Sequence, residues 1–91
     1  MSHSALIDSH EPLLLTLYGR KYCHLCDDMI AALQPLQSRF HFEVQVVDVD
    51  SNPEFERRYG EKVPVLVLGT EELCHYFLDI ATVTAALEKI R

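Results

Sequence analysis

The chain contains 91 residues, of which 48% are hydrophobic and 24% charged, and its formal net charge is −6. This composition is typical of one small globular domain and excludes an intrinsically disordered chain. Because Lys and Arg are not in excess and no apolar run reaches the roughly 18 residues of a membrane span, we expect neither nucleic acid nor a membrane as a partner.

The first residues are polar, and we expect residues 1–11 to be a flexible N-terminal tail and residues 12–91 to form one domain. The tail lacks the basic start and the long apolar stretch of a secretory signal. The chain has three cysteines, whereas small secreted scaffolds usually carry a larger and even set. These features predict a cytoplasmic protein, in which a cysteine pair is used for chemistry rather than as a structural link.

The first half of the domain predicts a strand, a helix and a second strand. Residues 13–18 form a nearly unbroken apolar run ended by Gly19, which is typical of a strand buried on both faces. Apolar residues then recur at helical spacing on one face, namely Cys26, Met29, Ile30, Leu33 and Leu36. Pro35 disfavours helical geometry at Gln34, so we expect the helix to stop or kink there. Alternating apolar residues over 42–50 predict the second strand.

The second half begins with a short helix and a hairpin. Residues 51–54 offer a capping side chain, a proline at the first helical position and an early glutamate, and this helix is expected to end at Gly60. Residues 63–68 predict a third strand with Pro64 at its entry, where proline is tolerated. A tight turn leads to its expected hairpin partner at residues 73–76.

A final helix is expected after the capping residue Asp79. Its apolar face is predicted to consist of Ile80, Val83, Leu87 and Ile90. The whole order is β-α-β-α-β-β-α, a βαβ unit followed by a hairpin and a helix. It predicts an α/β fold with a four-stranded mixed sheet and helices on both faces.

Cys23 and Cys26 carry the strongest chemical signal in the sequence. The first lies at the start of the predicted helix, where unpaired backbone N–H groups and the helix dipole favour a thiolate. The second lies one turn later, close enough to form a disulfide with it. We therefore expect thiol–disulfide exchange, in which Cys23 attacks a substrate disulfide and Cys26 resolves the mixed disulfide. Lys21 and His24 are candidates for stabilising the thiolate, and Arg20 is a candidate for steering anionic partners.

Other interpretations of the cysteines remain open. An iron–sulfur cluster shared between two chains would need a further thiolate source. A non-catalytic module would keep the fold and hold a partner in a cleft around Pro64, Tyr76 and Phe77. Cys74 fits either a small, half-buried strand residue or a third redox-active thiol. A zinc site, which lacks the usual spacing in its second half, would use Cys23, Cys26, Cys74 and His75.

Two sequence blocks carry a resemblance to a known family. The element order, the C-x-x-C after the first strand and the Val-Pro-Val that opens the third strand resemble the thioredoxin fold. The absence of an additional N-terminal strand and helix makes the chain most similar to the glutaredoxins. Residues 18–27 resemble the Tyr-x-x-x-x-Cys-x-Leu-Cys-Asp block of small glutaredoxin-like proteins, and residues 58–66 resemble their Arg-Tyr-Gly-x-x-Val-Pro-Val-Leu block. The resemblance covers residues 13–91.

The resemblance implies a role for each matching residue. Cys23 would be the nucleophile and Cys26 the resolving thiol. Pro64 would be a cis-proline that faces the dithiol, and Val63 would pair its backbone with an extended substrate chain. The other residues expected to bind substrate are Lys21, Tyr22, His24, Tyr76 and Asp79.

One departure from the family affects the co-substrate. Glutaredoxins that use glutathione resemble one another in a Gly-Gly turn followed by an acidic residue, whereas residues 76–78 here are Tyr-Phe-Leu and only Asp79 remains. The bulky side chains either block the tripeptide or form an apolar lip for a protein substrate. We therefore expect protein or small-molecule disulfides as substrates, glutathione or a reductase as the reductant, no resident cofactor or metal, and a monomer.

Overall fold

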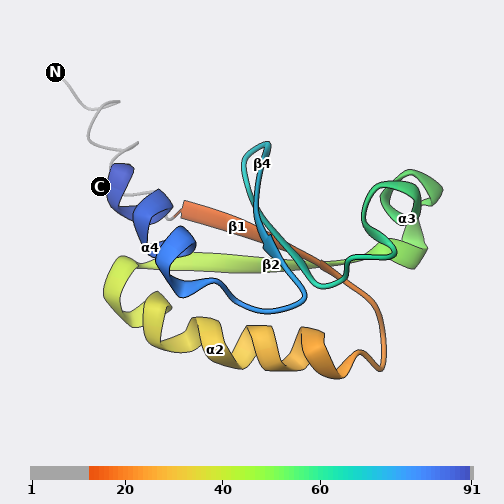
Figure 1. The fold of residues 1–91 in the computed structure, drawn as a ribbon, viewed down its shortest axis with the longest axis horizontal. Coiled ribbons are helices and arrows are strands. Elements are labelled where there is room, and N and C mark those ends of the chain that lie inside the picture. Colours follow the sequence, from red (N-terminus) through yellow and green to blue (C-terminus); the bar gives the residue numbers. More distant parts are fainter. Residues whose placement is uncertain (1–12, 91) are drawn as a thin grey trace, which may run out of the picture.

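The computed structural model describes residues 13–90, which form a four-stranded mixed sheet with helices on both faces (Figure 1). The elements are β1 (Leu13–Gly19), α2 (His24–Phe40), β2 (Phe42–Asp48), α3 (Pro53–Tyr59), β3 (Val65–Leu68), β4 (Glu71–His75) and α4 (Ile80–Lys89). This order confirms the predicted β-α-β-α-β-β-α arrangement, while the expected tail lies outside the described residues. Within residues 13–90, no helix combines the length and the apolar character that crossing a membrane requires.

The sheet has the strand order β2-β1-β3-β4. β1 and β2 run parallel, as the intervening α2 requires, and β3 is antiparallel to both β1 and β4. Tyr18 near the end of β1 is paired with Val65 at the start of β3, and Val65 is paired with His75 at the end of β4. The end of β1, the start of β3 and the end of β4 therefore meet at one edge of the sheet.

Two hydrophobic clusters lie on the two faces of the sheet. Leu66 of β3 belongs to the cluster formed with α2 and α4, whereas its neighbours Val65 and Val67 belong to the cluster formed with α3. Successive side chains of a strand point to opposite faces, so β3 contributes to both. The helices contribute Met29, Leu33, Leu36, Phe40, Val83 and Leu87 to the first cluster and Phe55 and Tyr59 to the second.

α2 continues through Pro35 to Phe40, so the stop, one of the two outcomes expected at this proline, is wrong, while the kink stays a prediction. Proline inside a helix removes a backbone donor and costs about 3 kcal/mol. Pro35 itself is exposed, but Leu36 and Phe40 after it are buried in the core. The Gln37 side chain also donates a hydrogen bond to the Phe42 carbonyl (3.1 Å) across the end of the helix. Packing of the last turn therefore outweighs the loss at the proline.

The helix starts agree with the prediction, but some strand limits do not. Asn52 caps α3 by accepting a hydrogen bond from the Glu54 N–H (2.8 Å), as expected. β2 ends at Asp48 rather than Asp50, because the Asp48 carboxylate accepts from the Asp50 N–H (2.9 Å) and begins a 3₁₀ turn, Val49–Ser51. β3 begins only after Pro64, which has no N–H to donate to a ladder.

The predicted apolar face of α4 is correct only in its middle. Val83 and Leu87 are fully buried, whereas Ile80 and Ile90 are exposed. Both exposed residues lie at the ends of the helix, past the part that covers the sheet. Ile80 also opens onto a surface hollow, which is described below.

Candidate redox site

The cysteine pair lies against the edge of the sheet where β1, β3 and β4 meet. Gly19 ends β1, and a β-carbon added to it would lie 2.9 Å from the Cys26 Sγ. This separation is shorter than a relaxed van der Waals contact, so only glycine at position 19 leaves room for the sulfur. Pro64 directly precedes Val65, which pairs with Tyr18 of β1, so it lies at the same edge. The register thus brings Cys26 and Pro64 to one place although they are far apart in the sequence.

The two cysteines differ in exposure. Cys23 caps α2, and its Sγ accepts a hydrogen bond from the Cys26 N–H (3.2 Å). The two sulfurs lie at disulfide distance, with the Cα atoms 5.2 Å apart. Cys26 is only 4% exposed, whereas Cys23 is partly accessible. The arrangement provides an outer sulfur that a substrate can reach and an inner sulfur that reaches only its partner.

Arg20 fastens the loop before the cysteines to distant parts of the chain. Its guanidinium contacts the Asp50 carboxylate (3.2 Å) and the Glu56 carboxylate (3.0 Å), and it donates to the Gly60 carbonyl (3.0 Å). Its charge is therefore used within the fold, and the structure does not support the steering role considered for it. The sequence offered no signal for this contact, because the three partners lie 30 to 40 residues away along the chain.

The other residues of this loop differ in what their side chains meet. His24 points its Nε2 at the Asp28 carboxylate (3.2 Å), so its charge when protonated is paired there. Lys21 is exposed and has no carboxylate partner within residues 13–90. Tyr22 is fully exposed beside Cys23. Lys21 therefore differs from His24 in having no carboxylate partner among these residues, and the binding roles of Lys21, Tyr22 and His24 stay predictions.

The segment around Pro64 is held by Tyr76. The Val63–Pro64 peptide bond is cis, and the Pro64 carbonyl accepts a hydrogen bond from the Tyr76 N–H (2.9 Å). The Tyr76 hydroxyl donates to the Glu61 carbonyl (2.9 Å), a contact that the sequence did not suggest. Within the part of the chain that the structure describes, the Val63 backbone groups have no hydrogen-bond partner. They are therefore available to pair with another chain.

Cys74 and His75 lie apart from the cysteine pair. Cys74 is paired with Leu66 and packs, half-buried, beside the cluster of α2 and α4. Burial raises the pKa of the Cys74 thiol, an effect that its contact with the backbone of Asp79 only partly offsets. His75 points toward Glu72 (3.6 Å). Within residues 13–90, no three His, Cys, Asp or Glu side chains gather as a metal site, so the four ligands considered for zinc are not brought together.

Asp79 caps α4, as predicted. One carboxylate oxygen accepts a hydrogen bond from the Thr82 N–H (3.1 Å) and the other from the Thr82 hydroxyl (2.9 Å). These hydrogen bonds lower the pKa of the exposed Asp79 carboxyl, so it stays ionised at neutral pH. Its expected role in substrate binding stays a prediction.

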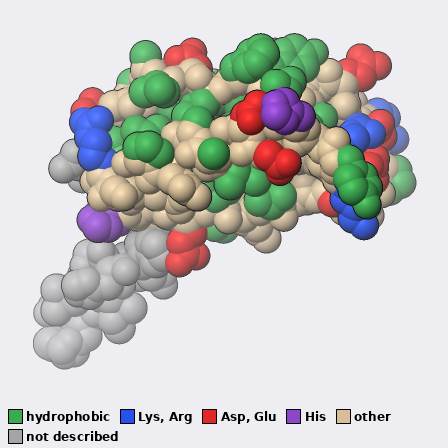
Figure 2. Space-filling view, turned by 90° about the horizontal axis from the view of Figure 1, so that it is seen from below, with side chains coloured by type: hydrophobic (Ala, Val, Ile, Leu, Met, Phe, Trp, Pro, Cys, Tyr) green, Lys and Arg blue, Asp and Glu red, His purple; other side chains and the backbone are tan. Residues whose placement is uncertain are grey.

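The charges around the helices are unevenly distributed. Figure 2 looks at the molecule from the α2 side, where hydrophobic side chains are interspersed with acidic and His side chains. The Lys and Arg side chains visible in this view gather toward its two ends. The middle of this face therefore carries more negative than positive charge in this view.

Known proteins share this fold and much of this sequence. The family model of the glutaredoxin-like domain (DUF836) matches residues 14–88. The chain is 46% identical to the protein Ne2328 from Nitrosomonas europaea, covering 84% of this chain and 92% of that chain with a TM-score of 0.77. It is 37% identical to the protein XcR50 from X. campestris, covering 82% and 96% with a TM-score of 0.64. Thioredoxin 1 from Thermosipho africanus, at 22% identity, 86% and 98% coverage and a TM-score of 0.57, shows the thioredoxin-like fold alone.

Proposed function

We propose that this chain, which belongs to the glutaredoxin-like domain family, is a thiol–disulfide oxidoreductase acting on protein or small-molecule disulfides. The observation that carries the proposal is the cysteine pair itself. An accessible Cys23 caps a helix at disulfide distance from a buried Cys26. A binding module would have no chemical need for this arrangement.

The surroundings of Cys23 favour its thiolate. The Cys26 N–H that points at the Cys23 Sγ is one of the backbone donors left unpaired at a helix start. Such donors and the helix dipole stabilise negative charge on a sulfur. Lys21 adds a positive charge in the same loop. The proposed nucleophile is therefore Cys23, and Cys26 is too buried to take this role.

The exchange proceeds in two steps. The Cys23 thiolate attacks one sulfur of the substrate disulfide, a mixed disulfide forms, and the other substrate sulfur leaves as a thiolate that takes a proton from water. Cys26 gives its proton to water and attacks the Cys23 Sγ, which releases the second substrate thiolate and forms the Cys23–Cys26 disulfide. The substrate gains two electrons, and either two molecules of glutathione or one external dithiol return them to the protein and become a disulfide.

The edge next to Pro64 supports a polypeptide substrate. The free N–H and C=O groups of Val63 offer an extended chain two backbone hydrogen bonds, as in β-strand addition. Because this edge lies beside the cysteines, the chain paired there would hold its disulfide near Cys23. The same pairing gives affinity without demanding particular side chains.

The first experiment is a redox titration. The protein is equilibrated in graded thiol/disulfide buffers, alkylated and analysed by mass spectrometry, with Cys74 as the internal thiol control. We expect one two-electron transition of Cys23 and Cys26 between about −270 and −120 mV, the range of known exchange proteins. Cys23→Ser should abolish turnover, and Cys26→Ser should accumulate the mixed disulfide. Failure of the pair to form a disulfide in any buffer contradicts the proposal.

A further inference from the structure

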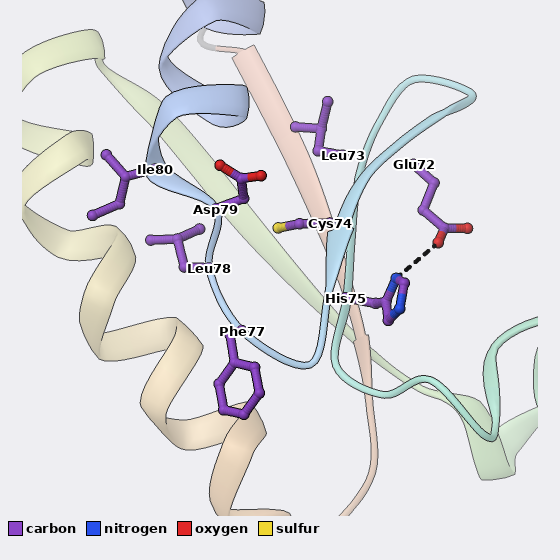
Figure 3. A pocket seen from close by; sticks show the side chains of 8 residues that line it. All are labelled: Glu72, Leu73, Cys74, His75, Phe77, Leu78, Asp79 and Ile80. Atoms are coloured by element: carbon purple, nitrogen blue, oxygen red, sulfur yellow. Dashed lines mark ion pairs between the residues drawn. The ribbon is translucent and has the colours of Figure 1, made fainter.

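A surface hollow of about 690 Å³ lies between β4 and the start of α4 (Figure 3). Figure 3 shows its lining side chains, with Cys74 pointing from β4 toward Leu78 and Asp79, which lead into α4. Leu78 and Cys74 are half-buried against the core and form its apolar floor. The floor of the hollow is therefore packed against the core of the protein.

Two large apolar side chains at the hollow are exposed to water. Phe77 is 68% exposed and Ile80 is 59% exposed. A single exposed apolar residue is ordinary, but two beside one hollow with an apolar floor make a surface that gains free energy when it is covered. Neither side chain is needed to fill the core, so folding does not account for them.

One side of the hollow, at Phe77, is adjacent in sequence to the residue that holds Pro64. Tyr76 donates its N–H to the Pro64 carbonyl (2.9 Å), and Phe77 is the next residue. An extended chain that pairs with Val63 and passes Tyr76 would therefore bring a side chain near its cysteine to the mouth of the hollow. A small disulfide bound at the cysteines would not extend as far as the hollow.

The charge of the hollow is negative. Its lining includes Glu72 and Asp79 but no Lys or Arg. Glu72 is paired with the Lys62 ammonium (3.1 Å), so its charge is balanced within the protein. Asp79 has no cationic partner within residues 13–90, and the net charge of the whole chain is −6. A positively charged group of a substrate would be attracted to this position.

We propose that the hollow between β4 and α4 is a specificity site for a polypeptide disulfide, in which an apolar side chain packs on Phe77 and Ile80 and a neighbouring Lys or Arg lies beside Asp79. The inference rests on the proposed function and names the substrate class of that same site. Such a site would favour polypeptide substrates over small disulfides, since only a polypeptide spans both the cysteine pair and the hollow.

The test compares disulfides of different size and charge. The probes are peptides whose cysteine is linked to 2-mercaptoethanol and flanked by Leu-Lys, Leu-Glu or Ser-Lys pairs, together with hydroxyethyl disulfide. The variant Phe77→Ser/Ile80→Ser removes the apolar rim, and Asp79→Asn removes the charge but keeps a capping residue. Ile90→Ser and Glu43→Gln are matched controls on exposed residues elsewhere.

We expect the wild-type protein to prefer the Leu-Lys peptide. The apolar-rim variant should lower kcat/KM for the Leu peptides by about tenfold, because the leucine of the substrate then loses its apolar contacts with Phe77 and Ile80. Asp79→Asn should remove the preference of Lys over Glu, and the apolar-rim variant and both controls should reduce hydroxyethyl disulfide like the wild type. Equal rates on all three peptides, or equal losses on peptide and small disulfide, overturn the specificity site alone. A wild type that turns over no disulfide overturns the proposed function, and with it the site.

Discussion

Replacing Gly19 with Ala tests the close approach between β1 and the inner cysteine. The added carbon would lie 2.9 Å from the Cys26 Sγ and 3.3 Å from the Leu17 Cδ2, whereas relaxed contacts are at about 3.5–4.0 Å. Overpacking of this size costs about 1–3 kcal/mol, and the lost flexibility of glycine in the unfolded chain offsets about 0.4–1 kcal/mol. We expect the disulfide form to lose about 1–2 kcal/mol of its free energy of unfolding.

The dithiol form should tolerate Gly19→Ala better. Once the disulfide is reduced, the Cys26 side chain is free to rotate away from the added methyl group. If this relieves about 1 kcal/mol, the reduction potential of the pair rises by about 20 mV, because 1.4 kcal/mol corresponds to about 30 mV for two electrons. The variant would thus be a slightly stronger oxidant than the wild type.

Urea unfolding of both redox forms measures the effect, and redox titration measures the potential. Gly69→Ala is the control, because Gly69 has a φ of +64° and no atom within 4 Å of an added β-carbon. It should lose about 1 kcal/mol from backbone strain, equally in both forms. Equal losses of the two forms in Gly19→Ala as well would refute the proposed contact with Cys26.

Three further predictions concern residues near the site. Arg20→Ala removes two ion pairs and a hydrogen bond to a carbonyl, so urea unfolding should show a loss of about 1–2 kcal/mol, against less than about 0.5 kcal/mol for the exposed Arg57→Ala. Hydrogen bonds from Thr82 lower the pKa of Asp79, so its ionised form stabilises the fold above the unfolded-state pKa of about 3.9. The stability of the wild type relative to Asp79→Asn should therefore fall as the pH drops through the lowered pKa, as unfolding at a series of pH values would show. Because burial raises the pKa of Cys74, iodoacetamide at pH 8 should label this thiol more slowly in the folded than in the unfolded protein, as measured by mass spectrometry.

The parts of the fold that depend on neighbours in sequence were predictable. Asn52 and Asp79 cap their helices through bonds to residues two or three positions later, so the sequence alone indicates where these helices begin. The effect of Pro35 was not predictable, because it depends on how Leu36 and Phe40 pack against distant strands. A local preference for stopping the helix was present but was outweighed by tertiary contacts.

Some features of the candidate site were likewise predictable from the sequence, and others were not. The spacing of Cys23 and Cys26 and the strand–loop–helix context indicate a redox pair, and the structure places the two sulfurs together. The ion pair between Arg20 and Glu56 joins segments 36 residues apart, and no periodic pattern in the sequence indicates such a pair. The hollow beside Phe77 likewise arises only when β4 and α4 meet, although the exposed apolar turn was visible in the sequence.

The segment that precedes Pro64 is held in place by contacts within the protein itself, without a substrate. Lys62 is bound to Glu72 (3.1 Å), and the Glu61 carbonyl accepts the Tyr76 hydroxyl (2.9 Å). A backbone held in this way has little conformational entropy left to lose, so the ordering cost of binding falls almost entirely on the incoming chain. A substrate stiffened in an extended form would accordingly bind more tightly than a flexible one with the same contacts.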